Sequence, residues 1–490
     1  MTTTDATTTD GTTAGATGSG TSASGRSAAD ANAAGATGSG TSTSGRGASD
    51  ASAAGTSAVR GDLAYFTGDP FTAEPEECFV HVPDGVVVMR EGRITAVGRA
   101  ADLAPGLPAG TRVDHHPGCL VGPGFIDAHV HYAQTGMIAS HGGRLIDWLN
   151  DHTFPAERAL ADPAVAADLA AAFVAELVRN GTTTALTFAT VHRHSVDALF
   201  TAAAAVDMRI IAGKVLMDRN APADLLDDPR RGYEESRDLI RAWHGRGRAG
   251  YAITPRFAPT SSPEQLRLAG ELWREFPDVH VHSHVAENAD EVRWVAELFP
   301  DRKGYLDVYH HHGLTGRRAV YAHAVHLGEE DFGLCHDTGT ALAHCPTSNT
   351  FLGSGLFPLH EAKAAERPVH VGLGTDVGAG TTFSLPATMG EAYKVAQLRG
   401  RDLDPLRSLY LATLGNARAL DIDRHVGTLA PGMEADLVVL DPRATPLLAR
   451  RTARAESVAD VVFALAVLAD DRVVRRTYIA GRPVDPDRIP

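Results

Sequence analysis

Two histidines lie one residue apart at the end of an apolar run, in the stretch PGFIDAHVHYAQ (123–134). Residues i and i+2 of a β-strand point to the same face, so the side chains of His129 and His131 could bind one metal ion together. An isolated His-x-His pair also occurs on ordinary half-buried strands, so the pair alone does not decide between a metal site and a structural role. The decision depends on which other metal-binding groups the chain brings to the same place.

Further groups that bind metals or transfer protons follow other short apolar runs: His284 and Glu287 in VHVHSHVAEN, His323 in VYAHAVHL and Asp376 in VHVGLGTDVGAG. Each has an ordinary alternative, since His323 could be a hydrogen-bonded core histidine, Asp376 a turn residue and Glu287 a solvated helix start. Taken together with the first pair, the set favours a functional interpretation. Three histidines and one carboxylate suit Zn²⁺ with one position open to water, whose pKa the ion lowers from about 15.7 to roughly 7.

The elements that must position these groups are repeated strand–helix units. Between residues 121 and about 420, short apolar runs alternate with Ala- and Leu-rich stretches such as ADPAVAADLAAAFVAELVRN (161–180). The candidate strands end near His131, Ala189, Met217, Pro259, Glu287, Leu327, Asn349 and Val377. Eight such units predict an α/β fold, a (β/α)8 TIM-like barrel, whose active face lies at the carboxyl ends of the strands. The candidate ligands would then meet at strands one, five, six and eight.

Strand-like patterns flank the predicted barrel on both sides. GVVVMREGRITAVG (85–98) indicates two strands around an Arg-Glu-Gly turn, and similar patterns return in VGTLAPGMEADLVVLDP (426–442) and VVRRTYIAGRPV (473–484). We therefore expect a small β-sandwich domain built from both chain ends. The expected division is 59–120 for its first part, 121–420 for the barrel and 421–490 for its second part.

The first 58 residues form a low-complexity tail made almost wholly of Thr, Ala, Gly, Ser and Asp. Within it, GATGSGTSASGRSAADANAA (15–34) recurs nearly intact as GATGSGTSTSGRGASDASAA (35–54). A segment without large apolar side chains cannot offset the entropy cost of ordering, so we expect residues 1–58 to be disordered and the folded body to begin near Leu63. A solvated linker is favoured over a binding role for this tail.

The composition of the chain favours an enzyme with a small-molecule substrate. A formal net charge of −15 over 490 residues would repel nucleic acids and anionic membranes. The four cysteines form no Cys-x-x-Cys pair, which indicates reduced thiols and a cytoplasmic location. No apolar run approaches the length of a membrane span, and MTTTDATTTDG has the features of no export signal.

Several blocks of the sequence resemble the guanine deaminases of the amidohydrolase superfamily. The metal motifs specify only the superfamily, while the narrower resemblance depends on WLNDHTFPAE (148–157), PRF (255–257) and GTDVGAGTTFS (374–384). The resemblance extends over about residues 61–484. It implies zinc-dependent hydrolytic deamination of guanine to xanthine and ammonia in purine catabolism, by a homodimer.

The resemblance implies a metal and two proton-transfer groups. One zinc ion per chain would be held by His129, His131, His284 and Asp376, with His323 either binding the ion or orienting its water. Asp376 would accept a proton from the attacking water, and Glu287 would protonate the ring nitrogen next to the attacked carbon. Positioned carboxylates commonly accelerate such transfers by about 10²–10⁴-fold.

The resemblance also implies a set of substrate-binding residues. Gln134 and Arg256 would hydrogen-bond the polar edge of the purine, and Phe257 would line its face. The guanidinium of Arg256 suits this role as a fixed donor fork, although it could instead only pair with a neighbouring carboxylate. The remaining substrate-binding residues expected are His131, His284, Glu287 and Asp376.

Other histidines and aromatics receive weaker interpretations. Trp148 is expected to wall the pocket or to pack the helix after the first strand, and the run His310–His312 to form a solvated turn. His282 could be drawn as the partner in a second His-x-His pair, but the resemblance favours His284 as the ligand. His344 and Asn349 could line the pocket and are assigned no role.

Alternatives to guanine deamination remain open at this point. YAITPRFAPT (251–260) lacks the lysine that bridges two metals in binuclear members of the superfamily, which favours one metal and deamination. A related enzyme could act on 8-oxoguanine, a triazine or an adenosine derivative. A barrel that has lost catalysis and serves as a scaffold is the alternative of another class, although no expected ligand is missing. The sequence contains no Pro-Cys-x-x-Cys, so a zinc site of the cytidine-deaminase type is excluded.

Overall fold

The computed structural model describes residues 55–143 and 145–489. Residues 1–54, which make up most of the tail expected to be disordered, lie outside this range. The first strand, β1 (Thr56–Phe66), starts well before Leu63, where the folded body was expected to begin. Thr56–Ala58 pair with Val88–Arg90 through their backbones, and backbone pairing needs no large side chains.

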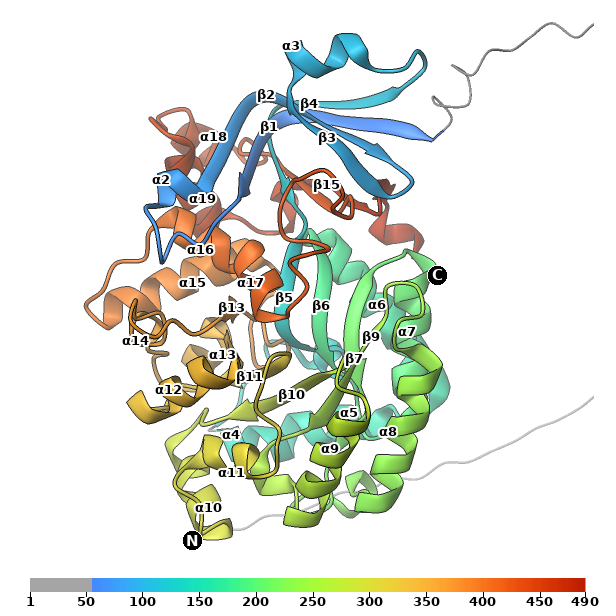
Figure 1. Cartoon of the computed structure of the whole chain (residues 1–490), viewed down its shortest axis with the longest axis vertical. Coiled ribbons are helices and arrows are strands. Elements are labelled where there is room, and N and C mark those ends of the chain that lie inside the picture. Colours follow the sequence, from blue (N-terminus) through green and yellow to red (C-terminus); the bar gives the residue numbers. More distant parts are fainter. Residues whose placement is uncertain (1–54, 144, 490) are drawn as a thin grey trace, which may run out of the picture. The chain divides into compact units, whose positions relative to one another are not determined.

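Strands from both chain ends form one hydrogen-bonded sheet of seven strands, in the order β16-β15-β14-β4-β1-β2-β3. In Figure 1 the strands β1 to β4 of the N-terminal part lie beside β15 of the C-terminal part. The predicted second sheet from both chain ends is therefore confirmed. Its strands after β1 are β2 (Phe79–Arg90), β3 (Arg93–Arg99), β4 (Arg112–Pro123), β14 (Leu437–Leu440), β15 (Val474–Ile479) and β16 (Arg482–Val484).

The middle of the chain forms a parallel barrel in the order β13-β12-β11-β10-β9-β7-β6-β5, and the short β8 (Val215–Leu216) pairs with β9. This order confirms the predicted (β/α)8 barrel. The strands are β5 (Phe125–His131), β6 (Thr182–Phe188), β7 (Arg209–Gly213), β9 (Gly250–Pro255), β10 (His280–Val285), β11 (Ala319–His323), β12 (Ala341–His344) and β13 (Val371–Leu373).

Helices alternate with the barrel strands and start at recognisable sequence signals. Asp162, Asp228 and Ser262 each accept a backbone N–H at a helix start and are each followed by proline, whose missing N–H costs nothing in the first turn. The longer helices are α6 (Pro163–Arg179), α7 (Arg193–Ala205), α8 (Pro229–Trp243), α9 (Pro263–Glu275), α10 (Ala289–Leu298), α11 (Tyr305–His311), α12 (Glu329–Thr338), α15 (Leu385–Leu398), α16 (Pro405–Leu411), α18 (Pro446–Thr452) and α19 (Val458–Leu468). No helix in the described part of the chain is both long and apolar enough to cross a membrane.

Asn416, in α17 (Leu414–Ala419), joins the first and last barrel strands. Its side-chain amide donates to the backbone oxygen of Leu373 on β13 at 2.9 Å and to that of Ile126 on β5. A Cβ on Gly372 would come within 1.7 Å of the Asn416 side-chain oxygen, so only glycine fits beside this bridge. The barrel is thereby closed next to the metal-binding candidates on β5.

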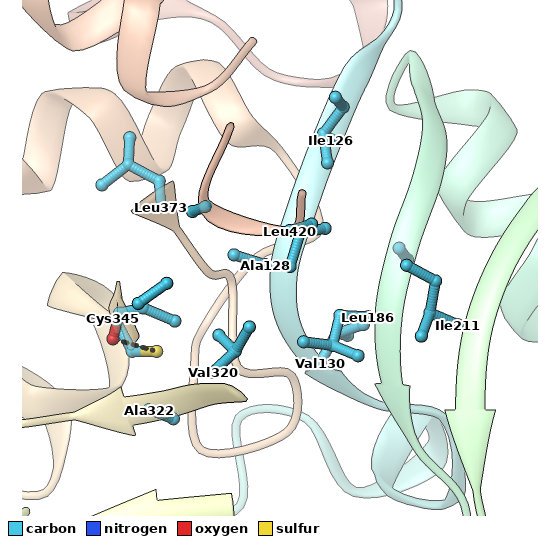
Figure 2. Close-up of a cluster of buried hydrophobic side chains, with 14 of the residues drawn as sticks. Ile126, Ala128, Val130, Leu186, Ile211, Val320, Ala322, Cys345, Leu373 and Leu420 are labelled. Atoms are coloured by element: carbon cyan, nitrogen blue, oxygen red, sulfur yellow. Dashed lines mark hydrogen bonds between the residues drawn. The ribbon is translucent and has the colours of Figure 1, made fainter. Parts of the chain in front are cut away.

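Alternation along β5 separates the core from the site. Figure 2 shows Ile126, Ala128 and Val130 among buried apolar side chains of neighbouring strands. The residues that alternate with them on the same strand, Asp127, His129 and His131, therefore point to the other face. One strand supplies both packing and ligands.

A partly buried ionic cluster joins the barrel to the second sheet. Arg248, which precedes β9, donates to Asp436 at 3.0 Å and contacts Glu434 at 2.5 Å. Arg209, at the start of β7, donates to the other oxygen of Glu434 at 2.6 Å. Because both carboxylates lie just before β14, the cluster fixes the second sheet to the amino ends of the barrel strands.

Candidate active site

Four side chains from three strand ends converge at the carboxyl end of the barrel: His129, His131, His284 and Asp376. The Nε2 atoms of His129 and His131 are 3.2 Å apart, and those of His131 and His284 are 3.3 Å apart. Oδ1 of Asp376 lies 3.2 Å from Nε2 of both His129 and His131. The predicted convergence of these residues is thus present in the structure.

The geometry and charge of this cluster fit a tetrahedral metal ion. Zinc–nitrogen bonds of about 2.1 Å place ligand atoms about 3.4 Å apart in a tetrahedron, close to the separations found here. Burial lowers the pKa of His131 to about 3 and the pKa of His284 well below its usual value, so the imidazoles are neutral. Burial disfavours the charge of Asp376, but the neighbouring histidine side chains, His129 foremost, outweigh it and hold the pKa of Asp376 well below its usual range. The donor set is therefore deprotonated, as metal binding requires.

Hydrogen bonds behind the cluster set the tautomers of two histidines. Nδ1 of His284 lies 2.7 Å from the backbone oxygen of Arg256 and must donate to it, which leaves the lone pair of Nε2 facing the cluster. Nδ1 of His129 lies 2.7 Å from Nε2 of His282. His282 is fully buried, and the structure places it as the partner of His129 rather than as a member of the four-residue cluster.

His323 lies beside the cluster, next to the two candidate proton-transfer carboxylates. Its Nδ1 is 2.9 Å from Oδ1 of Asn349 and donates to it. Its Nε2 is 3.5 Å from Oε2 of Glu287 and 3.8 Å from Oδ2 of Asp376. His323 also groups with Asp376 and Cys345, but the four-ligand cluster does not include it. This position favours the second of its two expected roles, orienting the water.

Glu287 is buried just beyond the end of β10. Burial and then the negative charge of Asp376 raise the pKa of Glu287 to about 8, so at neutral pH this carboxyl group carries a proton. The hydroxyl of Ser354 donates to Oε1 of Glu287 at 3.0 Å. The backbone N–H of Glu287 donates to Glu291, which also caps α10, so the acid is held from both sides.

A pocket opens above the cluster and contains all the residues expected to touch substrate. Its polar lining residues are His131, Gln134, Arg256, His284, Glu287, His323 and Asp376, and its apolar lining residues are Leu145, Trp148, Leu149, Phe257, Leu352 and Ala379. Trp148 therefore walls the pocket, which was the first of its two expected roles. A flat aromatic ring would meet apolar walls and a polar edge here.

The polar edge of the pocket contains an ion pair. Nη1 of Arg256 donates to Oε1 and Oε2 of Glu157 at 2.6 and 2.8 Å. Nε2 of Gln134 lies 3.5 Å from Oε1 of Glu157, while Oε1 of Gln134 accepts the N–H of Gly378 at 3.2 Å. Arg256 thus both lines the pocket and pairs with a carboxylate, which joins two interpretations that the sequence offered as alternatives.

Some residues near the site were missed or misplaced by sequence reasoning. The sequence assigned no role to Glu157, which ends the block WLNDHTFPAE, and none to Ser354. His344 stacks on Phe357 with ring centroids 4.7 Å apart and does not line the pocket. The run His310–His312 lies at the end of α11, with its first two residues exposed, as expected for a surface turn. A buried glutamate within reach of an arginine could be found only once the fold was known.

A parallel (β/α)8 barrel that gathers three histidines and a carboxylate at the carboxyl ends of its strands is the architecture of barrel enzymes that can hold a metal ion there. Residues 120–484 match the model of the amidohydrolase family, and the chain belongs to this family. The superfamily expected from the sequence blocks is therefore confirmed.

Relatives within the family include characterised and solved proteins. Guanine deaminase of Escherichia coli K12 is 50% identical over 403 residues, covering 82% of this chain and 91% of that protein. The solved E. coli guanine deaminase superposes with a TM-score of 0.84 at 47% identity, covering 88% of this chain and 99% of that one.

Two further solved structures carry ligands. Guanine deaminase of C. acetobutylicum with guanine bound in its active site has a TM-score of 0.78 at 26% identity, covering 88% of this chain and 100% of that one. An adenosine deaminase of Xanthomonas campestris with bound zinc has a TM-score of 0.74 at 26% identity, covering 87% of this chain and 92% of that one.

Proposed function

We propose that this protein is a guanine deaminase, which hydrolyses guanine to xanthine and ammonia. One observation carries the proposal: every residue expected to bind substrate or transfer a proton lines a single pocket, in a chain half identical to the E. coli guanine deaminase. The likeness to a solved guanine deaminase with guanine bound supports the same substrate.

The metal would be one zinc ion per chain, held by His129, His131, His284 and Asp376. The deprotonated donor set and its near-tetrahedral spacing support this choice, and a structural neighbour holds zinc. A divalent ion in this position supplies Lewis-acid assistance that makes water a nucleophile at neutral pH.

The proton transfers are assigned to two carboxyl groups. Asp376, which is ionised, accepts a proton from the attacking water as the new C2–O bond forms. Glu287, which carries a proton, donates it to the ring nitrogen next to C2. The proton held by Asp376 then passes to the leaving amino group, the C2–N bond breaks and ammonia departs. The remaining hydroxyl proton of the adduct returns to Glu287 as the C2=O bond of xanthine forms. Nε2 of His323, within 3.5 and 3.8 Å of the two carboxylates, keeps the attacking water between them.

The orientation of the base is assigned to the polar edge of the pocket. Arg256 and Gln134 both direct N–H groups along this edge, so they suit the carbonyl oxygen and ring acceptors of guanine. Phe257 is 5% exposed and packs edge-on against Trp294, with the two ring centroids 6.4 Å apart. It therefore offers a fixed wall for the face of the purine ring.

The finer cellular assignments are also proposals. We infer a cytoplasmic location, because the described cysteines are all free and buried, as is usual in a reducing compartment. We infer a role in purine catabolism from the proposed substrate. We infer a homodimer from the family resemblance. We keep the division into a tail (1–58), a barrel (121–420) and flanking sheet segments (59–120 and 421–490), except that Thr56–Ala58 belong to β1 and therefore to the first sheet segment.

The test is to purify the protein, measure its bound metal and follow guanine by chromatography beside adenine, 8-oxoguanine and cytosine. We expect about one zinc per chain and conversion of guanine to xanthine, with the Glu287→Ala variant inactive although it binds zinc. Bound metal without turnover of guanine would refute the substrate and direct the search to other aminated rings. Turnover undiminished in the Glu287→Ala variant would refute the assigned acid.

A further inference from the structure

Glu157 is a fully buried carboxylate that belongs to the segment covering the pocket. This segment consists of α4 (Leu145–Trp148), a π-helical turn (Leu149–Thr153) and α5 (Phe154–Ala159). Leu145, Trp148 and Leu149 line the pocket, whereas Glu157 is 0% exposed. Burying a carboxylate is costly unless it is paired, so a glutamate here needs a structural or functional reason.

The segment holds Arg256 in two ways. Glu157 binds Nη1 of Arg256 through both carboxylate oxygens, at 2.6 and 2.8 Å. The ring of Phe154, one turn earlier on the same helix, lies 5.7 Å from the guanidinium carbon. Among the described residues the guanidinium has no other protein hydrogen bond than those to Glu157, so its remaining N–H groups are left for the pocket that Arg256 lines.

Glu157 also determines which way the amide of Gln134 faces. Oε1 of Gln134 accepts the N–H of Gly378, and Nε2 points toward Glu157 at 3.5 Å. A carboxylate only accepts hydrogen bonds, so it favours this orientation of the amide over the flipped one. Both residues at the polar edge therefore present donors, and no acceptor, to a substrate.

We propose that Glu157 is a positioning residue that fixes Arg256 and Gln134 as a pair of donors and thereby selects a purine with a carbonyl group, rather than an amino group, at position 6. The proposal rests on the proposed function, because it refines how the same pocket recognises guanine. A 6-amino group would bring a donor against two donors, and unpaired buried polar groups are strongly rejected.

The test compares guanine with 2,6-diaminopurine, which carries the same 2-amino leaving group but an amino group at position 6. For the unmodified enzyme we expect kcat/KM for guanine to exceed that for 2,6-diaminopurine by at least about 100-fold, because a site built to hydrogen-bond one group rejects its mismatch. Equal turnover of the two bases would overturn the proposal without any variant. Turnover of neither base would instead refute the proposed function.

The Glu157→Gln variant gives the sharper test. Its amide can place an NH2 group against Nε2 of Gln134, which allows Gln134 to flip and present an acceptor. We expect KM for guanine to rise by about 10-fold or more with kcat within about threefold, and the preference for guanine to fall by about 10-fold or more. Glu157→Asp, which keeps the charge, should preserve the preference.

The control is Glu434→Gln, which weakens partly buried arginine–glutamate pairs at the far end of the barrel. Both variants should melt at lower temperature than the unmodified enzyme, but only Glu157→Gln should change the guanine preference. A folded Glu157→Gln protein with unchanged KM and unchanged preference would contradict the proposal. If Glu157→Gln fails to fold, the comparison of the two bases on the unmodified enzyme and on Glu157→Asp still decides the matter.

Discussion

The two ends of β9 each carry an arginine paired with a carboxylate, Arg248 partly buried and Arg256 buried, and the two arginines are used differently. Before the strand, both terminal nitrogens of Arg248 are bound by protein oxygens, from Asp436, Glu434 and the backbone of Asp207. After the strand, Arg256 gives only Nη1 to Glu157 and lines the pocket with the rest of its guanidinium. An arginine whose two terminal nitrogens are both bound by the protein joins two parts of the fold, while an arginine with only one terminal nitrogen bound is available to a ligand.

The whole barrel follows the same contrast. At its amino end, Glu434 and Asp436 join the second sheet to the barrel, and attraction to Asp436 and Glu434 outweighs burial to raise the pKa of Arg248. At its carboxyl end, neutral histidines and a protonated glutamate lie close together, and the described part of the protein does not supply a hydrogen-bond partner for every polar atom of these side chains. We therefore expect substitutions at the carboxyl end to change catalysis and substitutions at the amino end to change stability.

Among the substitutions that leave the enzyme active, the largest effect should come from Arg256→Lys. Lysine keeps the charge and can pair with Glu157, but it loses the planar fork that reaches the base. We expect KM for guanine to rise about 10–100-fold with little change in the melting temperature, measured by steady-state kinetics and thermal unfolding. An unchanged KM would mean that Arg256 is as structural as Arg248.

Substitutions of His282 test how far zinc binding depends on residues that hydrogen-bond the candidate metal ligands. Nε2 of His282 lies 2.7 Å from Nδ1 of His129 and would accept from it when His129 binds a metal through Nε2, and loss of such a partner typically lowers metal affinity about 10–100-fold. We expect His282→Leu to weaken zinc binding by this factor in a competition with a coloured chelator, and His282→Gln, which retains an acceptor, to weaken it less. Equal affinities in all three proteins would show that the hydrogen bond does not support the ligand.

The pH dependence of the reaction should reflect Glu287. Burial and the charge of Asp376 raise its pKa to about 8, and the proposed acid is active only while it holds its proton. The rate should therefore be maintained below about pH 8 and should fall about tenfold per pH unit above it. Profiles of kcat/KM against pH would show this alkaline fall. If kcat/KM of the Glu287→Asp variant begins to fall at the same pH as that of the unmodified enzyme, another group titrates.

The smallest effect on activity should come from Glu434→Gln at the amino end. Removing this charge leaves Arg209 and Arg248 without one partner, and such a loss costs about 1–3 kcal/mol of unfolding free energy. Denaturant unfolding should show this loss, while kcat/KM for guanine stays within about twofold of the unmodified enzyme. A fall in activity larger than the fall in stability would remove the distinction between the two ends.

The sequence predicted which side chains lie near the strand ends better than it predicted the residues at which the strands end. The fourth strand was expected to end near Pro259, the sixth near Leu327 and the seventh near Asn349, but they end at Pro255, His323 and His344. The apolar pattern continues past each strand because the following loops are themselves buried beneath the pocket, as Ala258 and Ala324 are. Burial, rather than strand pairing, produced the signal.

The metal-binding candidates could be predicted because their types and spacing are specific. His129 and His131 are two residues apart on one strand and so share a face, and parallel strands bring their carboxyl ends to one end of the barrel. Glu157 could not be predicted in the same way, because its partner Arg256 is 99 residues away and a glutamate on a short helix is usually solvated. Its role depends on burial, which only the packed structure reveals.

The most direct test of the account is to titrate metal-free protein with Zn²⁺ while the rate of xanthine formation from guanine is measured. The cluster of three histidines and Asp376 predicts no activity without metal, a linear rise with added zinc and saturation at one ion per chain. Full activity in the metal-free protein, or saturation only at two ions per chain, would contradict it.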